Sequence, residues 1–194
     1  MERNLTHIAL FAALIAVLGL VPGITLAAGV PITAQSLGVM LCGTVLGAKR
    51  GALAVLLFLA LVLAGLPLLT NGRGGIGVLY GPSAGFIIGF PITAFIAGWI
   101  MERRTLPVGL AASFGALIGG IFVLYAIGIP VMAARLTDEQ VSNAFAEVPN
   151  YKNLPLMAGL AALYLPGDLI KVVLAGLVTN GIARMRPASL LSRA

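Results

Sequence analysis

The sequence has very few charged residues. Among its 194 residues, 12 are Lys or Arg and 6 are Asp or Glu, so that 9% of the chain is charged while 60% is hydrophobic. An ordinary soluble domain carries about 25% charged residues, and this composition therefore excludes a soluble protein and indicates an integral membrane protein. The net charge of +6 does not indicate a nucleic-acid partner, because the basic residues stand at the ends of apolar runs instead of forming one basic face.

Cysteine and histidine occur once each, as Cys42 and His7. A single cysteine inside an apolar run excludes a disulfide framework and a clustered thiol site, so we expect Cys42 to be a packing residue. One histidine offers little for a metal site or for the nucleophile and base that an enzyme needs. The sequence therefore predicts no metal, no cofactor and no enzymatic activity.

A phosphate-binding loop of the form GxxxxGK[ST] is also missing. The chain is therefore not expected to hydrolyse ATP unaided, and any such energy must come from a partner. Residues 72–77 match the pattern GxGxxG, but this segment follows an apolar run and not a short strand. We interpret it as a flexible loop and not as a dinucleotide site.

Uncharged apolar runs are abundant. Residues 5–48 contain no charged side chain, and a helix of that length would extend about 66 Å, more than twice the ~30 Å hydrocarbon core. The run must turn back, and the helix breakers between Pro22 and Pro31 mark the turn. The pattern along the chain predicts one all-α integral membrane domain, residues 1–194, with six transmembrane helices at about residues 5–21, 33–48, 51–69, 78–101, 106–134 and 154–183.

Basic residues are distributed unequally between the two sides of this topology. One side would carry Arg3, Lys49, Arg50, Arg103, Arg104, Arg184, Arg186 and Arg193, and the other would carry Arg73, Arg135 and Lys152. An excess of Lys and Arg marks the cytoplasmic side of a membrane protein. Both termini are therefore predicted to be cytoplasmic, in a protein that crosses the bilayer several times.

Two opposite charges lie inside the last predicted helix. Asp168 and Lys171 are three residues apart and so share one helix face. A charge near the middle of a spanning helix costs roughly 2.5–3.5 kcal/mol on insertion scales, so such charges usually face a protein-lined cavity and serve a function. Pro166 and Gly167 precede the pair, and a kink there would leave carbonyl groups free to face a ligand. The alternative is an ion pair that only fixes helix packing.

Small residues recur at four-residue spacing in two of the predicted helices. The fourth helix carries Gly77, Gly81, Gly85, Gly89, Thr93 and Ala97, and the first carries the pairs Ala9 with Ala13 and Ala12 with Ala16. Such ridges let helix backbones approach closely. We expect the ridge on the fourth helix to pack inside the bundle. The alanines on the first helix could either do the same or dock another membrane protein.

A polar segment between the fifth and sixth helices predicts a short helix. Thr137 and Gln140 have the spacing of a capping box. Apolar residues follow on one face of this segment: Val141, Ala144, Phe145 and Val148. The segment is expected to lie on the bundle.

Polar residues in two breaks between helices are candidates for a binding site with Asp168 and Lys171. In the predicted topology both breaks lie on the outer side, and they contain Thr33, Gln35, Asn71, Arg73 and Tyr80. If these side chains converge above the charged pair, the site offers both acceptors and donors. Such a set suits a small ligand with a polar ring and an acidic end. The residues alone do not identify the molecule.

Five segments of the chain resemble one known family. Residues 30–41, 47–53, 64–67, 75–86 and 166–171 are similar to the BioY family, the biotin-binding S components of energy-coupling factor (ECF) transporters. The resemblance covers nearly the whole chain. It implies an S-component-type bundle in the bacterial inner membrane that captures biotin from the outer side for ATP-driven uptake. It also implies association with a transmembrane T component and two ATPase subunits.

The resemblance assigns roles to particular residues. It maps the acid and the lysine of the family's last helix onto Asp168 and Lys171, and its loop asparagine onto Asn71. Asp168 would accept the ureido N–H groups of biotin, while Lys171 would hold Asp168 ionised and donate to the ligand. The contact with the T component would fall on Ala9, Ala12, Ala13 and Ala16. A secondary transporter that works alone, or an S component for another small vitamin, remains the alternative.

Overall fold

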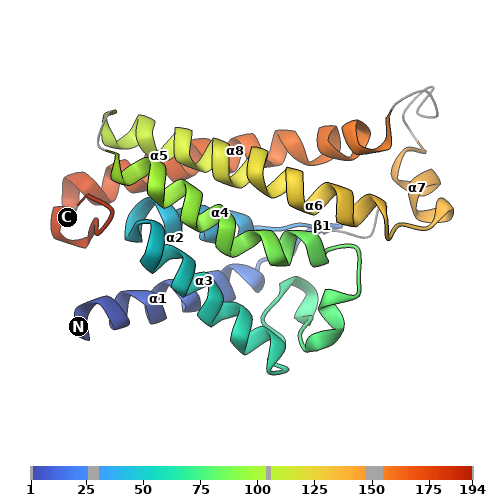
Figure 1. Ribbon diagram of the computed structural model, residues 1–194, viewed down its shortest axis with the longest axis horizontal. Coiled ribbons are helices and arrows are strands. Elements are labelled where there is room, and N and C mark those ends of the chain that lie inside the picture. Colours follow the sequence, from blue (N-terminus) through green and yellow to red (C-terminus); the bar gives the residue numbers. More distant parts are fainter. Residues whose placement is uncertain (1, 26–30, 104–105, 147–154, 194) are drawn as a thin grey trace.

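The structure is a computed structural model that describes residues 2–25, 31–103, 106–146 and 155–193. Its long helices run side by side, roughly parallel to the longest axis of the molecule (Figure 1). The α-helices are α1 (Glu2–Gly19), α2 (Gln35–Leu46), α3 (Ala48–Leu63), α4 (Ala84–Glu102), α5 (Val108–Leu117), α6 (Leu124–Ala133), α7 (Asp138–Ala144) and α8 (Leu156–Met185). The predicted all-α class is confirmed.

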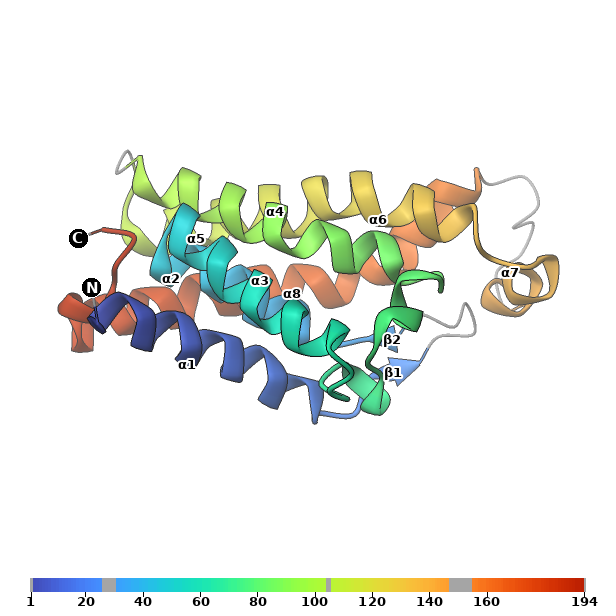
Figure 2. The same cartoon turned by 60° about the horizontal axis from the view of Figure 1, so that its bottom comes forward.

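Short elements connect α1 with α2 and α3 with α4, and another follows α8. A two-residue antiparallel pair, β1 (Ile24–Thr25) and β2 (Pro31–Ile32), lies between α1 and α2. The 3₁₀ turns η1 (Thr70–Gly72) and η2 (Ile76–Leu79) lie between α3 and α4, and η5 (Pro187–Ser189) follows α8. In Figure 2 the β pair and α7 are at the end opposite the two termini.

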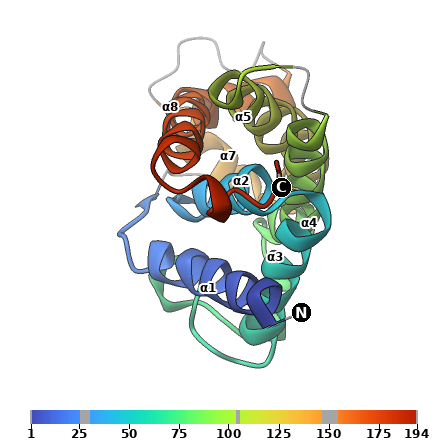
Figure 3. The same ribbon diagram turned by 90° about the vertical axis from the view of Figure 1, so that its left-hand side faces the viewer.

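The second helix, α2, is the centre of the bundle. Figure 3, which looks along the helices, shows α2 surrounded by α1, α3, α4, α5 and α8. Almost every residue of α2 is buried, which explains why its sequence is apolar without a polar stripe. Gly47 ends α2 with a positive φ of 89°, a conformation that favours glycine, so that α3 begins at Ala48 and the predicted link residues Lys49 and Arg50 lie in its first turn.

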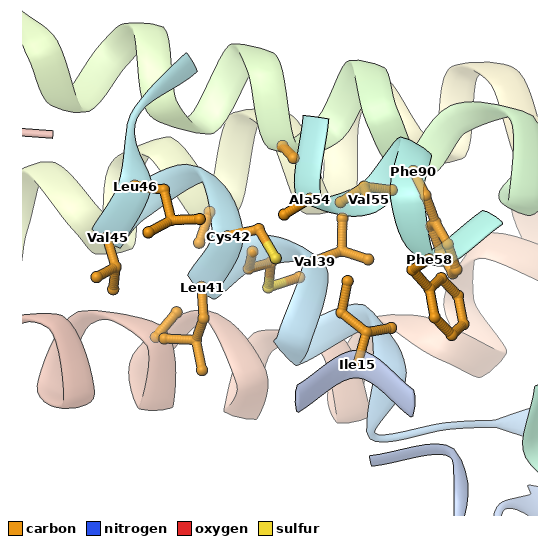
Figure 4. Close-up of a cluster of buried hydrophobic side chains, with 14 of the residues drawn as sticks. Ile15, Val39, Leu41, Cys42, Val45, Leu46, Ala54, Val55, Phe58 and Phe90 are labelled. Atoms are coloured by element: carbon orange, nitrogen blue, oxygen red, sulfur yellow. The ribbon is translucent and has the colours of Figure 1, made fainter. Parts of the chain in front are cut away.

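The core lies between α2 and its neighbours. In Figure 4 side chains from α1, α2, α3 and α4 meet around Val39, among them Ile15, Val55 and Phe90. Cys42 lies in the same cluster, fully buried and with a free thiol. The prediction that Cys42 is a packing residue is confirmed.

The small-residue ridge on α4 packs inside the bundle, as predicted, where it lies against α6, but it is shorter than predicted. A Cβ added at Gly85 would meet Val131 and the carbonyl of Ile127, and one added at Gly89 would meet Leu124. Gly77 and Gly81 precede α4, which begins at Ala84. Including these two in the ridge was wrong, because residues 76–79 form a 3₁₀ turn whose residues do not continue the face of α4.

The rod opposite α4 contains a π-helical stretch. Helix α5 continues into η3 (Ile118–Val123), a π-helix, and then directly into α6. The hydroxyl of Thr93 on α4 donates to the carbonyl of Gly119 at 3.0 Å. Among the described residues, this rod, α4 and α8 are long and apolar enough to cross a membrane, while α1 and α2 are apolar but shorter.

The short helix predicted after the fifth span is α7. Its capping box is formed: the backbone N–H of Gln140 donates to the Thr137 hydroxyl at 3.3 Å, and the Thr137 N–H donates to the Gln140 side chain at 3.0 Å. Phe145, just after α7, is buried against α8 near Gly159. Val148 lies outside the described residues.

Candidate ligand-binding site

A cavity with an open mouth lies between α2, α4, α6 and α8. Its lining is Ile32, Thr33, Gln35, Ser36, Leu69, Arg73, Ser83, Phe86, Ile87, Phe90, Leu124, Tyr164, Asp168 and Lys171. Small-molecule sites combine apolar walls with a few polar groups. The cavity has such a lining, with its polar groups supplied mainly by α2, α8 and the segment before α4.

Asp168 and Lys171 form an ion pair on the wall of this cavity. The Lys171 Nζ lies 2.7 Å from Oδ1 of Asp168, and their side chains are 12% and 9% exposed, respectively. Two charges withdrawn from water to this extent need each other and further hydrogen bonds. Each of them has one such bond in addition to the ion pair.

These two hydrogen bonds come from different helices. The hydroxyl of Tyr125 on α6 donates to Asp168 Oδ2 at 2.6 Å. Lys171 donates to the hydroxyl of Ser36 on α2 at 3.0 Å. The pair therefore joins α2, α6 and α8 beside the cavity, and each carboxylate oxygen of Asp168 receives one donor.

Pro166 does not interrupt α8, which is a single helix from Leu156 to Met185. A proline lacks the N–H that would otherwise bond to the carbonyl four residues earlier, here Ala162. Gly167 lies against Ile32, since a Cβ at Gly167 would come within 3.3 Å of that side chain. Gly167 thus lets the β2 segment approach α8 next to Asp168.

Arg73 is the second cation of the cavity. Its Nε donates to the carbonyl of Thr70 at 3.3 Å and its Nη1 donates to the Ser83 hydroxyl at 3.1 Å. Burial lowers the pKa of the Arg73 guanidinium, although an arginine remains charged in proteins. With Asp168, Lys171 and Arg73 in its lining, the cavity has a formal charge of +1, which suits a ligand carrying one negative charge.

Gln35 lines the cavity, but its amide group is bonded to the protein. Its Nε2 donates to the carbonyls of Ile15 and Leu68 at 3.2 and 3.0 Å. Its Oε1 accepts from the N–H and the hydroxyl of Thr70, both at 3.1 Å. A buried amide must satisfy its donors and acceptors, and here they hold the loop after α3 against α1. In this structure Gln35 shapes the site and presents no free amide to a ligand.

Of the three remaining predicted site residues, one lines the cavity and two do not. Thr33 lines the cavity, whereas Asn71 and Tyr80 are not among its lining residues. Asn71 is exposed, with a left-handed φ of 65°, and Tyr80 is 77% exposed. The 3₁₀ turns η1 and η2 direct these two side chains away from the cavity, so the expected convergence of all five loop residues is not seen.

Several residues of the site, in its lining or directly behind it, were not among the predicted site residues. Tyr164 precedes Asp168 by one helical turn, a spacing that could have identified it. Phe86 packs near Tyr164, with ring centroids 6.2 Å apart, and the two form part of an aromatic wall. Ser36 and Tyr125 reach the ion pair from helices far away in the sequence, and no local pattern indicates them.

The four alanines of α1 face in different directions. Ala12 is 3% exposed and belongs to the core, and Ala16 is partly buried against it. Ala9 and Ala13 are exposed. Ala9 and Ala13 are therefore the alanines most accessible to another protein.

Comparison with known proteins identifies the family. The family model described as "BioY family" matches residues 2–188. The chain belongs to the BioY family. A biotin transporter BioY from Rhodobacter capsulatus is 55% identical to this BioY-family chain over the full length of both. Another, from Rhizobium etli, is 43% identical over 93% of this chain and 92% of its own.

A solved structure supports the same assignment. The crystal structure of the S-component for biotin from an ECF-type ABC transporter matches with a TM-score of 0.78 and 30% identity, over 95% of this BioY-family chain and 92% of the other. The family resemblance found in the sequence is confirmed, as is the expectation that the chain is not an enzyme, since the family consists of transport proteins. The chain is a membrane protein with an S-component fold.

Proposed function

We propose that this chain is the biotin-binding S component of an ECF transporter, which captures biotin from the outer side of the membrane. The proposal draws on relatives that are named biotin transporters and on the similar S-component for biotin. The observation that carries it is the cavity that contains Asp168, Lys171 and Arg73 among apolar side chains. The chemistry of this lining matches the chemistry of biotin.

Biotin has a ureido ring with two N–H groups, an apolar thioether ring with a hydrocarbon chain, and a terminal carboxylate. Asp168 accepts the ureido N–H groups, because a carboxylate has about four lone-pair positions and the protein uses two of them. Phe86, Ile87 and Phe90 contact the apolar part. Arg73 binds the carboxylate, since arginine recognises carboxylates with parallel N–H bonds.

Lys171 donates to Asp168 and holds its carboxylate in place as an acceptor for the ligand. Thr33 contributes a hydroxyl at the cavity, and Gln35 acts by fixing the loop that carries Thr70 and Arg73. Asn71 and Tyr80 contribute if the loops between α3 and α4 close over bound biotin. Closure of this kind would withdraw the ligand from water.

The chain spans the inner membrane of a bacterial cell six times, with both termini in the cytoplasm. The spans are α1, α2, α3, α4, the α5–α6 rod and α8. The excess of Lys and Arg near the end that holds the termini supports this orientation, and both termini lie at one end of the bundle (Figure 2). The β pair and the cavity-lining Thr33 next to it would then face the outside.

Uptake requires a T component and two ATPase subunits. Ala9 and Ala13, exposed on α1, form the contact with the T component, since small residues permit close helix approach. Ala12 and Ala16 were assigned to the same contact from the sequence. For Ala12 this assignment is replaced by packing inside the bundle, because its side chain is buried.

Binding of biotin to the purified protein tests the proposal. Asp168→Asn and Lys171→Ala should each weaken binding at least tenfold, the effect of losing a hydrogen bond to a charged group. Lys49→Ala removes an exposed lysine at the other end of the bundle and serves as the matched control. Near wild-type affinity in both cavity variants would refute the assignment. Uptake assays with and without the energising subunits distinguish an S component from a transporter that works alone.

A further inference from the structure

Tyr125 lies behind the cavity and not on its surface. It is absent from the lining residues, yet its hydroxyl donates to Asp168 Oδ2 at 2.6 Å. Lys171 occupies the other oxygen at 2.7 Å. The carboxylate of Asp168 is thus held between a donor on its own helix and a donor on α6.

The π-helical stretch before α6 determines the direction of Tyr125. A π turn holds about one residue more than an α turn, so an unbroken α-helix over the same residues would rotate everything after Val123 by about 100°. Tyr125, two residues later, would then no longer point at α8. Single π turns inside α-helices occur frequently at functional sites.

The neighbouring helices hold this stretch in place. Gly119 and Gly120 fall within it, and a Cβ at these positions would meet the Thr93 carbonyl on α4 and the Met40 side chain on α2, respectively. The Thr93 hydroxyl donates to the Gly119 carbonyl at 3.0 Å, which supplies a partner for a carbonyl in the irregular part of the hydrogen-bond ladder. The packing of α2 and α4 therefore stabilises the geometry that aims Tyr125.

We propose that Tyr125 is a positioning residue for ligand recognition: it orients the Asp168 carboxylate so that its remaining lone pairs point at two ligand N–H groups. This inference rests on the proposed function and assigns a residue that does not touch the ligand. Tyr125 and Lys171 each donate to one oxygen of the Asp168 carboxylate and thereby fix its orientation, so that the remaining lone pairs of both oxygens can accept hydrogen bonds. Together, Tyr125 and Lys171 make the site selective for a ligand that presents N–H groups to the Asp168 carboxylate.

The test compares biotin with a biotin analogue that is methylated on a ureido nitrogen. Wild-type protein should prefer biotin, because methylation removes an N–H and adds bulk. Tyr125→Phe removes only the hydroxyl and should weaken biotin binding by about tenfold or more, as expected for a hydrogen bond to a charged group. It should weaken binding of the analogue less, so that the preference for biotin falls.

Thr93→Val tests the same inference without changing Tyr125. Loss of the bond to Gly119 should reduce the preference for biotin in the same direction as Tyr125→Phe. Adding Tyr125→Phe to Asp168→Asn should cause a much smaller further loss than it does in the wild-type protein, because residues that act through one group are not additive.

Thr44→Val is the matched control. It removes a buried hydroxyl bond of 2.9 Å between Thr44 on α2 and Thr179 on α8, away from the cavity lining, and should lower thermal stability without altering the preference for biotin. The inference would be overturned if Tyr125→Phe left the preference for biotin unchanged, or if its loss of affinity simply added to that of Asp168→Asn. Either result would leave the proposed function, biotin binding by the wild-type protein, unaffected. Failure of the wild-type protein to bind biotin would instead overturn the proposed function.

Discussion

The ammonium group of Lys171 lies 3.0 Å from the hydroxyl of Ser36, which is 135 residues earlier in the chain. This bond connects α8 with the first turn of the central helix α2, whose side chains are almost all buried. Lys171 therefore has two partners, Asp168 and Ser36, and its position depends on how two distant helices pack.

Removing the hydroxyl of Ser36 should loosen Lys171. Among the described residues, Ser36→Ala leaves the Lys171 ammonium with Asp168 as its remaining hydrogen-bond partner, and we expect biotin binding to weaken by about three- to tenfold. Titration calorimetry of the purified protein measures the change. Ser142→Ala, on the exposed face of α7, is the control and should bind as the wild type does. A loss of similar size in the control would contradict the prediction.

Arg73 should discriminate between ligands by their acidic end. If it binds the carboxylate of biotin, Arg73→Gln should lower the affinity for biotin by about tenfold or more. The affinity for biotin amide, which lacks the charge, should change little. Competition binding with the two ligands measures the ratio, and Arg186→Gln, exposed after α8, is the control. Equal losses for both ligands would place the carboxylate elsewhere.

Gln35 should matter mainly for stability. Gln35→Ala would leave the buried N–H of Thr70 and the carbonyl of Leu68 without their present partner, at a cost of about 2–4 kcal/mol. Thermal unfolding in detergent should show a fall in Tm of roughly 5–10 °C. Gln140→Ala on exposed α7 provides the comparison, with a much smaller fall. A stable Gln35→Ala protein that has lost only biotin binding would argue for direct ligand contact.

At Gly98, α4 packs so closely against the junction of α2 and α3 that an added methyl group should not fit. A Cβ at Gly98 would overlap the backbone of Gly47 and Ala48, so Gly98→Ala should destabilise the protein by about 1–3 kcal/mol. At Gly181 in α8 a Cβ would meet only the end of Met185, at 3.9 Å. Gly181→Ala should therefore be neutral or stabilising, since alanine is favoured over glycine inside a helix. Thermal unfolding of both variants decides, and equal behaviour would argue against the close contact.

The exposed and buried alanines of α1 should respond differently to leucine. Ala13→Leu should weaken co-purification with a T component and leave biotin binding unchanged, because Ala13 is exposed. Ala12→Leu should lower the stability of the isolated protein by about 1–3 kcal/mol, because Ala12 is buried in the core. If Ala13→Leu reduced stability and assembly together, the exposed face of α1 would be needed for the bundle itself.

Local features of the sequence were enough to predict several parts of this structure. Scarce charge indicated a membrane protein, and the spacing of Thr137 and Gln140 predicted the cap of α7. The three-residue spacing of Asp168 and Lys171 placed both on one face of α8, where they form an ion pair. Each of these inferences depends on residues within one helical turn, whose relative directions follow from helix geometry.

The tertiary structure decided everything that depends on contacts between helices. It brought Tyr125 and Ser36 to the ion pair, used the amide of Gln35 inside the protein, and turned Asn71 and Tyr80 away from the cavity. It also separated buried Ala12 from exposed Ala13. The sequence by itself determined the class of protein, the family and the charged pair, because composition and short spacings record them. It could not determine which distant side chains meet, because that depends on how the helices are rotated and packed, including the π turn before α6.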